Sequence, residues 1–233
     1  MLSVLYEIQN LIYLSRHGKV NTMKLTVFGA TGATGTSLVT QALAAGHEVT
    51  AVVRDPARLA VPESPRLRIV TADVMDPAAI GPAVAGADAV LSALGPRGNG
   101  PTTVSQDSIR SIIQAMQKTG ARRLLTISGT VVTDVGEGPL MRFVLKPLVR
   151  RTALRHVCAD MRSAEDEVHK SNLAWTIMRP PRLTDKPATG TYRTAIDRNL
   201  PRAYTISRAD VAACMLTVLD DPTTVHKHVF AAN

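Results

Sequence analysis

The sequence predicts a single α/β domain built on a doubly wound, mostly parallel sheet with helices on both faces. Short apolar runs of β type alternate with segments of helical spacing from residue 24 onward. The first of these runs breaks into glycines at positions 29, 32 and 35. A length of 233 residues with 45% apolar residues is enough for one full core. Strands separated by helices imply right-handed crossovers and therefore a parallel sheet.

The first motif spans residues 25–35 and reads Leu-Thr-Val-Phe-Gly-Ala-Thr-Gly-Ala-Thr-Gly. A strand that enters a glycine loop and then a helix makes a pyrophosphate site, because backbone N–H groups and the helix N-terminus face outward. Gly29 permits the sharp turn, Gly32 lets the backbone approach the phosphates, and Gly35 lets the helix pack closely on its strand. Small residues also pack helices against sheets without any ligand, so the segments that follow decide the interpretation.

Those segments complete one nucleotide-binding half of a Rossmann fold. Helical spacing over 36–45 is followed by a buried strand over 48–53. The residue that ends this second strand meets the adenosine ribose, where an acid binds the 2′-hydroxyl and an arginine accommodates a 2′-phosphate. Here Arg54 ends the strand, Arg58 follows, and Asp55 stands one place late. A guanidinium matches a phosphate and a carboxylate repels it, which favours NADPH over NADH. The alternative is that Arg54 and Arg58 are solvated loop charges.

The remaining elements keep alternating. Asp76 before Pro77 is a typical helix start, and Ser207 with Asp210 three residues later is another. Glu165 is expected to be exposed, together with the two acidic residues after it, and Asn172 is expected to end their helix. Further strands are expected over 67–71, 88–91, 123–127, 174–178 and 225–230, and further helices over 77–84, 102–118, 163–169 and 211–219.

Ligands of such sheets gather at the carboxyl ends of the strands. Polar or small residues stand at these ends, and they are Gly29, Arg54, Asp73, Ser92 to Gly95 and Ser128. This edge is therefore the expected binding site.

The motifs together resemble the atypical short-chain dehydrogenase/reductase superfamily, which includes NmrA-like proteins. The resemblance rests on Gly-Ala-Thr-Gly-x-x-Gly, Val-Arg-Asp-Pro-Ala-Arg-Leu at 53–59, Asp-Val after the third strand, and a fifth strand that ends in Ser128. Within the superfamily, Pro-Pro-Arg-Leu-Thr-Asp-Lys-Pro-Ala-Thr-Gly-Thr-Tyr at 180–192 is similar to the NADPH-dependent flavin reductases, also called biliverdin reductase B. The similarity runs from about residue 23 to the C-terminal strand.

The resemblance implies a reductase that passes hydride from NADPH to a flat, electron-poor acceptor such as a flavin, a biliverdin-like tetrapyrrole or a quinone. A flavin would then be a substrate rather than a prosthetic group. Carried over by position, the residues around the pyrophosphate are Gly29, Thr31, Gly32, Thr34 and Gly35. In the same way, Arg54 and Arg58 are placed at the 2′-phosphate. Asp73 and Val74 are placed at the adenine, and Leu94 and Gly95 at the nicotinamide ribose.

On the acceptor side, the resemblance places Ser128 beside the nicotinamide and Pro180, Pro181 and Arg182 around the reacting ring. The flavin reductases have histidine where this chain has Arg182. Arginine cannot shuttle a proton near neutral pH but can hold a phosphate or carboxylate, so a different acceptor is compatible with this change.

A missing motif narrows the chemistry. Short-chain dehydrogenases that interconvert alcohols and carbonyls use a Tyr-x-x-x-Lys pair ~12 to 15 residues after the serine, in which the tyrosine is the proton donor. The interval from Ser128 to Asp160 contains no tyrosine. Hydride transfer to an electron-poor ring needs chiefly two rings in contact, and solvent can supply the proton. Ser128 is thus interpreted as an orienting residue, and the alternative is a serine that caps a strand end.

Charge and rare residues exclude other classes of protein. The net charge is +8, and Arg142, Lys146, Arg150 and Arg155 can share a helix face within a basic segment at 142–156. That face is either solvated or part of a lid that attracts anions. Nucleic-acid binding is not expected, because aromatic residues are not interleaved with the basic ones. Cys158 and Cys214 are expected to be reduced core thiols.

No metal site is expected, because His169, His226 and His228 lack metal-like spacing. Residues 1–22 are interpreted as an N-terminal extension, either poorly ordered or a mistaken start, before an NAD(P)-binding domain over 23–233. Neither a signal peptide nor a membrane span is evident, so a cytoplasmic protein is expected. A monomer and a homodimer both stay open. The competing function is a non-catalytic NADP-binding sensor or assembly factor of the NmrA-like type.

Overall fold

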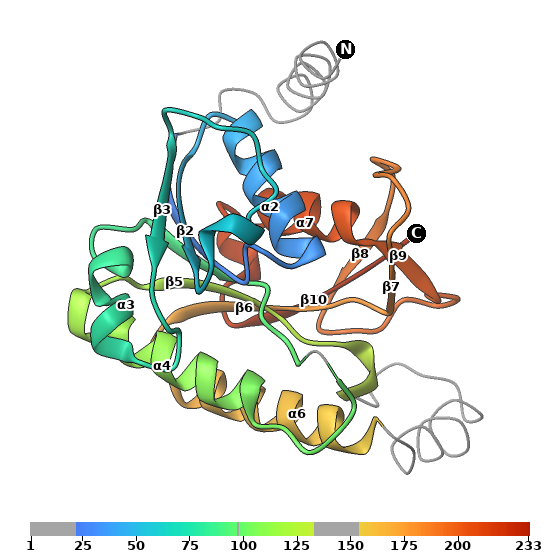
Figure 1. The fold of residues 1–233 in the computed structure, drawn as a ribbon. Coiled ribbons are helices and arrows are strands. Elements are labelled where there is room, and N and C mark those ends of the chain that lie inside the picture. Colours follow the sequence, from blue (N-terminus) through green and yellow to red (C-terminus); the bar gives the residue numbers. More distant parts are fainter. Residues whose placement is uncertain (1–21, 97, 133–153) are drawn as a thin grey trace.

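A computed structural model describes residues 22–96, 98–132 and 154–233 as one α/β domain (Figure 1). Its main sheet has the strand order β3-β2-β1-β4-β5-β6-β10-β8, and a small second sheet pairs β7 with β9. Within the main sheet only β8 runs antiparallel to its neighbour. The strands are β1 Lys24–Phe28, β2 Glu48–Val53, β3 Leu67–Thr71, β4 Ala89–Ser92, β5 Arg123–Ile127, β6 Ala174–Arg179, β7 Arg182–Thr184, β8 Arg193–Ile196, β9 Thr205–Ser207 and β10 Lys227–Ala232.

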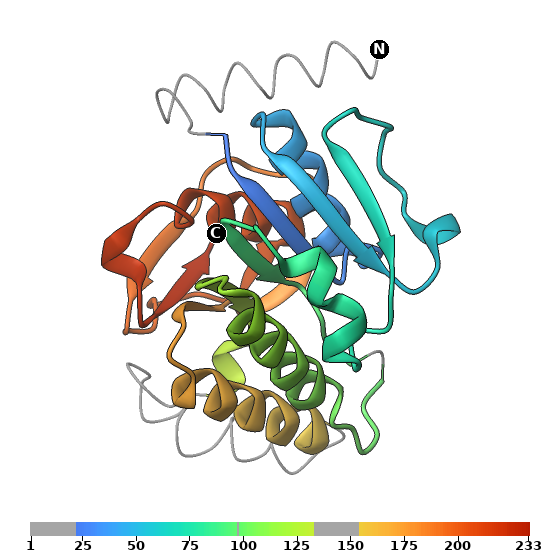
Figure 2. The same ribbon diagram turned by 90° about the vertical axis from the view of Figure 1, so that its left-hand side faces the viewer.

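Helices cover both faces of the main sheet (Figures 1 and 2). On one face α2 (Ala33–Ala44) packs beside α7 (Arg208–Thr217). On the other face α4 (Val104–Thr119) lies between α3 (Pro77–Val84) and α6 (Arg155–Lys170). Three short 3₁₀ helices complete the described elements, and they are η1 Pro56–Arg58, η2 Thr130–Val132 and η4 Pro222–Thr224.

Two apolar cores lie above and below the sheet, because side chains alternate along each strand. In β6, Trp175 and Ile177 face the α4–α6 core, whereas Met178 faces the α2–α7 core. Cys158 and Cys214 are both buried and form no disulfide within the described part of the chain, as the sequence predicts. Burial raises the pKa of the Cys214 thiol to about 12, so this sulfur stays protonated and unreactive.

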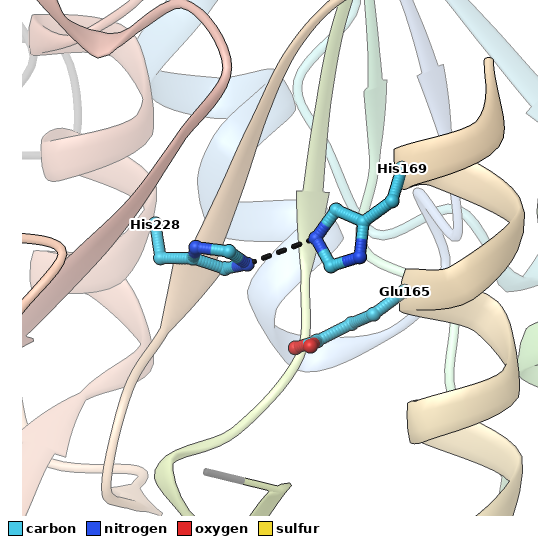
Figure 3. Close-up of side chains that lie close together, drawn as sticks. All are labelled: Glu165, His169 and His228. Atoms are coloured by element: carbon cyan, nitrogen blue, oxygen red, sulfur yellow. Dashed lines mark hydrogen bonds between the residues drawn. The ribbon is translucent and has the colours of Figure 1, made fainter. Parts of the chain in front are cut away.

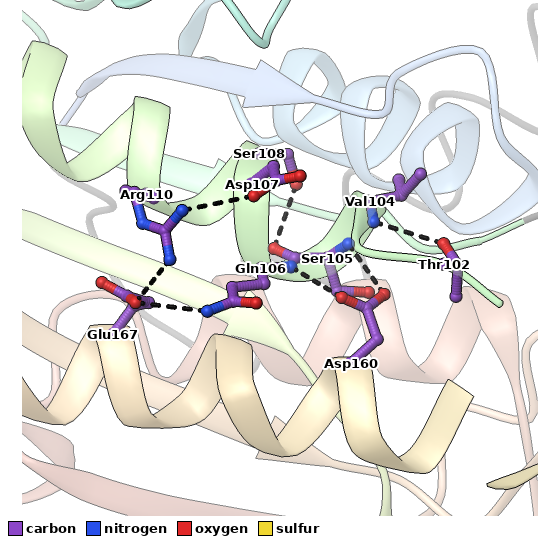
Figure 4. Close-up of polar contacts among 9 residues, drawn as sticks. All are labelled: Thr102, Val104, Ser105, Gln106, Asp107, Ser108, Arg110, Asp160 and Glu167. Atoms are coloured by element: carbon purple, nitrogen blue, oxygen red, sulfur yellow. Dashed lines mark hydrogen bonds and ion pairs between the residues drawn. The ribbon is translucent and has the colours of Figure 1, made fainter. Parts of the chain in front are cut away.

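The pair α4–α6 is joined by polar contacts at both ends of its interface (Figure 4). Asp160 of α6 is 4% exposed and accepts the backbone N–H groups of Ser105 and Gln106, at 2.9 and 3.0 Å, which caps the start of α4. Farther along, Arg110 of α4 donates to Glu167 of α6 at 2.9 Å. These contacts fix α6 against α4, and both helices line the cavity beside Ser128.

Helix starts were predictable from local sequence. Asp76 accepts from two backbone N–H groups at the start of α3, and Ser207 accepts from Asp210 N at the start of α7. Burial alone would raise the pKa of Asp210, but hydrogen bonds from Thr189, Ser207 and Gly190 lower it. The buried carboxylate thus holds the 189–190 loop against α7.

Two expectations for the C-terminal third are wrong. Residues 182–200, for which no strand is expected, contain β7 and β8. These strands form because β7 pairs with β9 and β8 pairs antiparallel with β10. Glu165, expected to be exposed, is 4% exposed because it turns inward from α6 onto Arg179 of β6. The N-terminal extension up to residue 21 lies outside the described residues, and so do Arg142, Lys146 and Arg150 of the basic segment.

No helix among the described residues is long and apolar enough to cross a membrane.

Candidate functional site

Six neighbouring parallel strands bring the sequence-predicted residues to one edge of the sheet. The carboxyl ends of β3, β2, β1, β4, β5 and β6 all lie there, because each of these strands is parallel to its neighbour. The chain order reverses between β1 and β4, so the edge has a topological switch point at which such sheets bind ligands. Both loops at this switch point are glycine-containing.

The glycine loop after β1 is tightly closed. Gly29 has a φ of +77°, and a Cβ there would meet the Ala93 carbonyl group at 2.8 Å. A Cβ on Gly35 would lie 2.0 Å from the Gly29 carbonyl oxygen. Gly32 is the N-cap of α2 and donates to Gly29 O at 2.9 Å. The roles of Gly29 in the turn and of Gly35 in close packing are as the sequence predicts.

The start of α2 has the character of an anion site. Among the described residues no side chain caps it, and no acidic residue stands in its first turn, in contrast to α3, α4 and α7, which have side-chain acceptors at their starts. Gly32 is exposed, Thr31 is half-buried and Thr34 is buried beneath the loop. The uncapped N–H groups and the helix dipole fit a pyrophosphate.

After β2, the acidic side chain is hydrogen-bonded within the protein, whereas the two basic side chains are exposed. Asp55 is the N-cap of η1, and its Oδ1 accepts Ala57 N at 3.1 Å. Arg54 and Arg58 are exposed on either side of this turn. The carboxylate is thus used to build the turn that presents the two guanidinium groups.

The adenine and ribose candidates lie at the ends of β3 and β4. Asp73 is exposed, and its Oδ1 accepts Met75 N at 3.1 Å, which shapes the turn before α3. Val74 and Leu94 are half-buried against the α4–α6 core, and Gly95 is exposed. These four residues form the exposed rim and apolar floor of the edge on either side of the glycine loop.

Ser128 lies between the ends of β5 and β6. Its N–H donates to Met178 O at 2.8 Å, and Thr130 N donates to Pro180 O at 3.1 Å, so Ser128 and Pro180 lie side by side. The Ser128 side chain is buried and its Oγ has no hydrogen-bond partner among the described residues. Nothing in the described structure therefore makes it a capping serine.

Ser128 lines a cavity of about 20 Å³ between the sheet and the α4–α6 pair. Ser92, Ser105 and Glu165 also line it, and Ser105 Oγ is the second hydroxyl there without a partner in the described part of the chain. A cavity of this size has room for about one water molecule. A buried hydroxyl without a partner at a strand's carboxyl end fits one that would hydrogen-bond to a bound ring or to water.

Pro181 and Arg182 continue from this point into β7. Pro181 is half-buried, and Arg182 is exposed at the start of the small sheet, where it pairs with Thr205 of β9. The nearby acid Asp185 forms an ion pair with Arg208 at 2.6 Å. Arg182 thus lies at the end of the edge opposite to Arg54.

A buried ion pair that was not predicted from the sequence lies beneath the edge. Arg179 ends β6 and is 8% exposed, and its guanidinium binds both carboxylate oxygens of Glu165. Arg179 also lies over the Phe230 ring, 5.8 Å from its centroid. Because the two charged residues are 14 positions apart on different elements, only the position of Glu165 on the apolar stripe of α6 could have indicated the pair.

A larger groove of about 380 Å³ lies at the opposite edge of the sheet. It is lined by the amino ends of β1, β2 and β3, among them Lys24, Glu48 and Leu67, and by the loop after α3. None of the predicted site residues lines this groove.

Comparisons with known proteins agree with the motif at the switch point. The family model described as NAD(P)H-binding matches residues 29–222. An uncharacterised chloroplastic protein of Arabidopsis thaliana is 32% identical over 181 residues, which are 73% of this chain and 63% of that protein. The match thus spans less than two thirds of the plant protein.

Solved structures share the fold. A short-chain dehydrogenase/reductase of Veillonella parvula in complex with NADP superposes with a TM-score of 0.76 at 18% identity, covering 91% of this chain and 95% of that one. A putative NADH-flavin reductase of Streptococcus pneumoniae gives 0.72 at 23% identity, covering 91% and 99%. The chain belongs to the NAD(P)H-binding family, and it shares a Rossmann-type fold with these solved structures.

Proposed function

We propose that the protein is an NADPH-dependent reductase that passes hydride to a flat, electron-poor acceptor such as a flavin, a biliverdin-like tetrapyrrole or a quinone. The observation that carries the proposal is the closed glycine loop at the switch point, beside an uncapped start of α2. This arrangement fits a dinucleotide pyrophosphate through the backbone of Gly29, Thr31, Gly32, Thr34 and Gly35.

The choice of NADPH rests on the end of β2. Asp55 is engaged as the cap of η1, so it is not free to accept from a ribose 2′-hydroxyl without loosening that turn. Arg54 and Arg58 flank the turn and can bind a 2′-phosphate through charge-assisted hydrogen bonds. Asp73 and Val74 are assigned to the adenine, and Leu94 and Gly95 to the nicotinamide ribose.

The dinucleotide supplies a hydride from the C4 position of its nicotinamide ring. The protein holds two rings in contact and excludes water between them. Ser128 orients the ring, Pro180 and Pro181 form an apolar wall, and Arg182 binds an anionic group of the acceptor. No tyrosine lies between Ser128 and Asp160, so solvent rather than a Tyr-x-x-x-Lys pair donates the proton. The putative NADH-flavin reductase with the same fold is consistent with this chemistry.

The test is NADPH oxidation by the purified protein with FMN, FAD, riboflavin, biliverdin and quinones, followed at the nicotinamide absorbance. We expect turnover with at least one of them. Replacing Ser128 by Ala should lower kcat by about tenfold, the worth of one hydrogen bond of ~1.4 kcal/mol, and leave NADPH affinity nearly unchanged.

A matched control is Ser111→Ala, because Ser111 is also buried with an unpartnered Oγ among the described residues but lies on α4 away from the edge. Tight NADPH binding without oxidation across the panel contradicts the reductase and supports the NADP-binding sensor. Equal rates for the Ser128→Ala and Ser111→Ala variants contradict the role of Ser128.

A further inference from the structure

Three side chains converge between α6 and β10 (Figure 3). Glu165 and His169 are one turn apart on α6, so they project from the same side of the helix. His228 faces them from β10. A hydrogen bond of 3.1 Å joins Nε2 of His169 to Nε2 of His228, and one ligand atom from each of the three residues lies within 4.8 Å of the others.

The separation of the two imidazole nitrogens is close to that of two ligands in a metal's coordination shell. Two ligands of a tetrahedral ion bound at about 2.0–2.1 Å lie roughly 3.3 Å from each other. The two imidazoles already have this separation. The Glu165 carboxylate points toward the two imidazoles (Figure 3), and one of its oxygens lies within 4.8 Å of their ligand atoms.

The surroundings of His228 are those of a metal-binding histidine. Its other ring nitrogen, Nδ1, lies 3.4 Å from Asp197 Oδ1, and the same oxygen accepts the His228 backbone N–H at 2.9 Å. A carboxylate behind the imidazole fixes the tautomer that leaves Nε2 unprotonated toward the centre.

The histidine rings are also held in place by packing. Trp175 of β6 contacts both, with ring centroids 5.0 Å from His169 and 5.5 Å from His228. His169 is exposed, which gives an ion a path from solvent. The site is thus rigid on the β10 side and open on the α6 side.

Glu165 can serve two partners. Its bidentate pair with Arg179 uses one lone pair on each oxygen, and a carboxylate has about four such positions. The guanidinium orients the carboxylate and also removes its net charge. A metal site with this second partner is expected to bind more weakly than one with a free carboxylate, but it needs no movement of the backbone.

We propose that Glu165, His169 and His228 form a zinc site with one open coordination position. Two imidazoles and one carboxylate in a four-coordinate arrangement suit Zn²⁺, whereas Mg²⁺ and Ca²⁺ require oxygen ligands. The ion joins α6 to β10, and therefore the helix that lines the Ser128 cavity to the far half of the sheet. This role is independent of hydride transfer.

The test is calorimetric titration of the untagged, chelator-treated full chain with Zn²⁺, with and without NADPH. We expect one equivalent to bind in either case, and excess Mg²⁺ not to compete. His169→Gln and His228→Gln should each weaken binding by about tenfold or more, and Glu165→Gln should also weaken it. Co²⁺ should give the intense visible absorption of a four-coordinate ion.

The matched control is His156→Gln, a histidine on the same helix whose Nε2 accepts from Arg155 rather than facing the cluster. It should bind Zn²⁺ like the wild type. No zinc uptake by the wild type, unchanged binding in both histidine variants, or a six-coordinate Co²⁺ spectrum contradicts the site. The wild-type spectrum decides the matter even where circular dichroism shows that a variant has not folded.

Discussion

At the end of β2 a single carboxylate decides how the neighbouring arginines are presented. Asp55 follows Arg54 directly and accepts Ala57 N, and so starts η1, which ends at Arg58. The acid thus has a structural role, and the exposed guanidinium groups are the groups available to a cofactor. On this view cofactor preference depends on Arg54 and hardly on Asp55.

Replacing Arg54 by Asp should weaken NADPH binding by about 100-fold, because it removes charge-assisted bonds worth ~1.5–3 kcal/mol and adds repulsion of the 2′-phosphate. NADH lacks this phosphate and should lose little affinity. Fluorescence titration with each nucleotide measures both effects. Arg68→Asp is the control, since Arg68 is also exposed but lies within β3 rather than at its carboxyl end. An equal loss of affinity for both nucleotides would remove the case for NADPH.

The site residues that the sequence predicted depend on local position in the chain. Those that it did not predict come together through contacts between elements far apart in the chain. Gly29, Arg54 and Ser128 each directly follow a predicted strand, so strand position alone assigned them to the edge. Glu165, His169 and His228 come together only because β10 is placed beside β6 and faces α6. The contact between the two histidines was not predictable from the sequence, because 59 residues separate them in the chain.

Two helical glycines show how differently the same residue acts in α2 and α3. A Cβ on Gly35 would meet backbone atoms of Gly29 at 2.0 and 2.6 Å, whereas a Cβ on Gly81 would meet nothing within 4 Å. Gly35 lets α2 start directly against the end of β1. Gly81 only lowers the helix propensity of α3.

Gly35→Ala should therefore destabilise the protein by about 2–4 kcal/mol, because the overlap involves backbone that cannot turn aside. Gly81→Ala should be neutral or stabilise it by up to ~1 kcal/mol. Urea denaturation measures both free energies of unfolding. Similar stability for the two variants would mean that the loop relaxes and that the tight packing of α2 on β1 is not required.

Elements were predictable where buried pairing and local sequence agree. The bounds of β2, β3 and β5 match the apolar runs in the sequence, and α3 and α7 start at their predicted caps. The short strands β7, β8 and β9 were not predictable in this way. Proline, threonine and glycine dominate residues 184–194, and those strands exist because of their partners rather than their composition.

At the scale of the whole molecule, the sheet separates two kinds of chemistry. The carboxyl edge from Arg54 to Arg182 carries the NAD(P)H-binding motif and the proposed acceptor site. The half of the sheet formed by β6 and β10 carries the ion pair of Glu165 with Arg179 and the histidines. Glu165 contributes to both regions, because it lines the Ser128 cavity and faces His169 and His228.

The most direct test of hydride transfer at this edge uses NADPH that carries deuterium on one face or the other of nicotinamide C4. The protein oxidises each isomer with the best acceptor of the panel, and mass spectrometry weighs the recovered NADP⁺. Rings held in one orientation should remove deuterium completely from one isomer and leave it completely in the other. NADP⁺ with partial loss of label from both isomers, or no oxidation of either, would contradict the account.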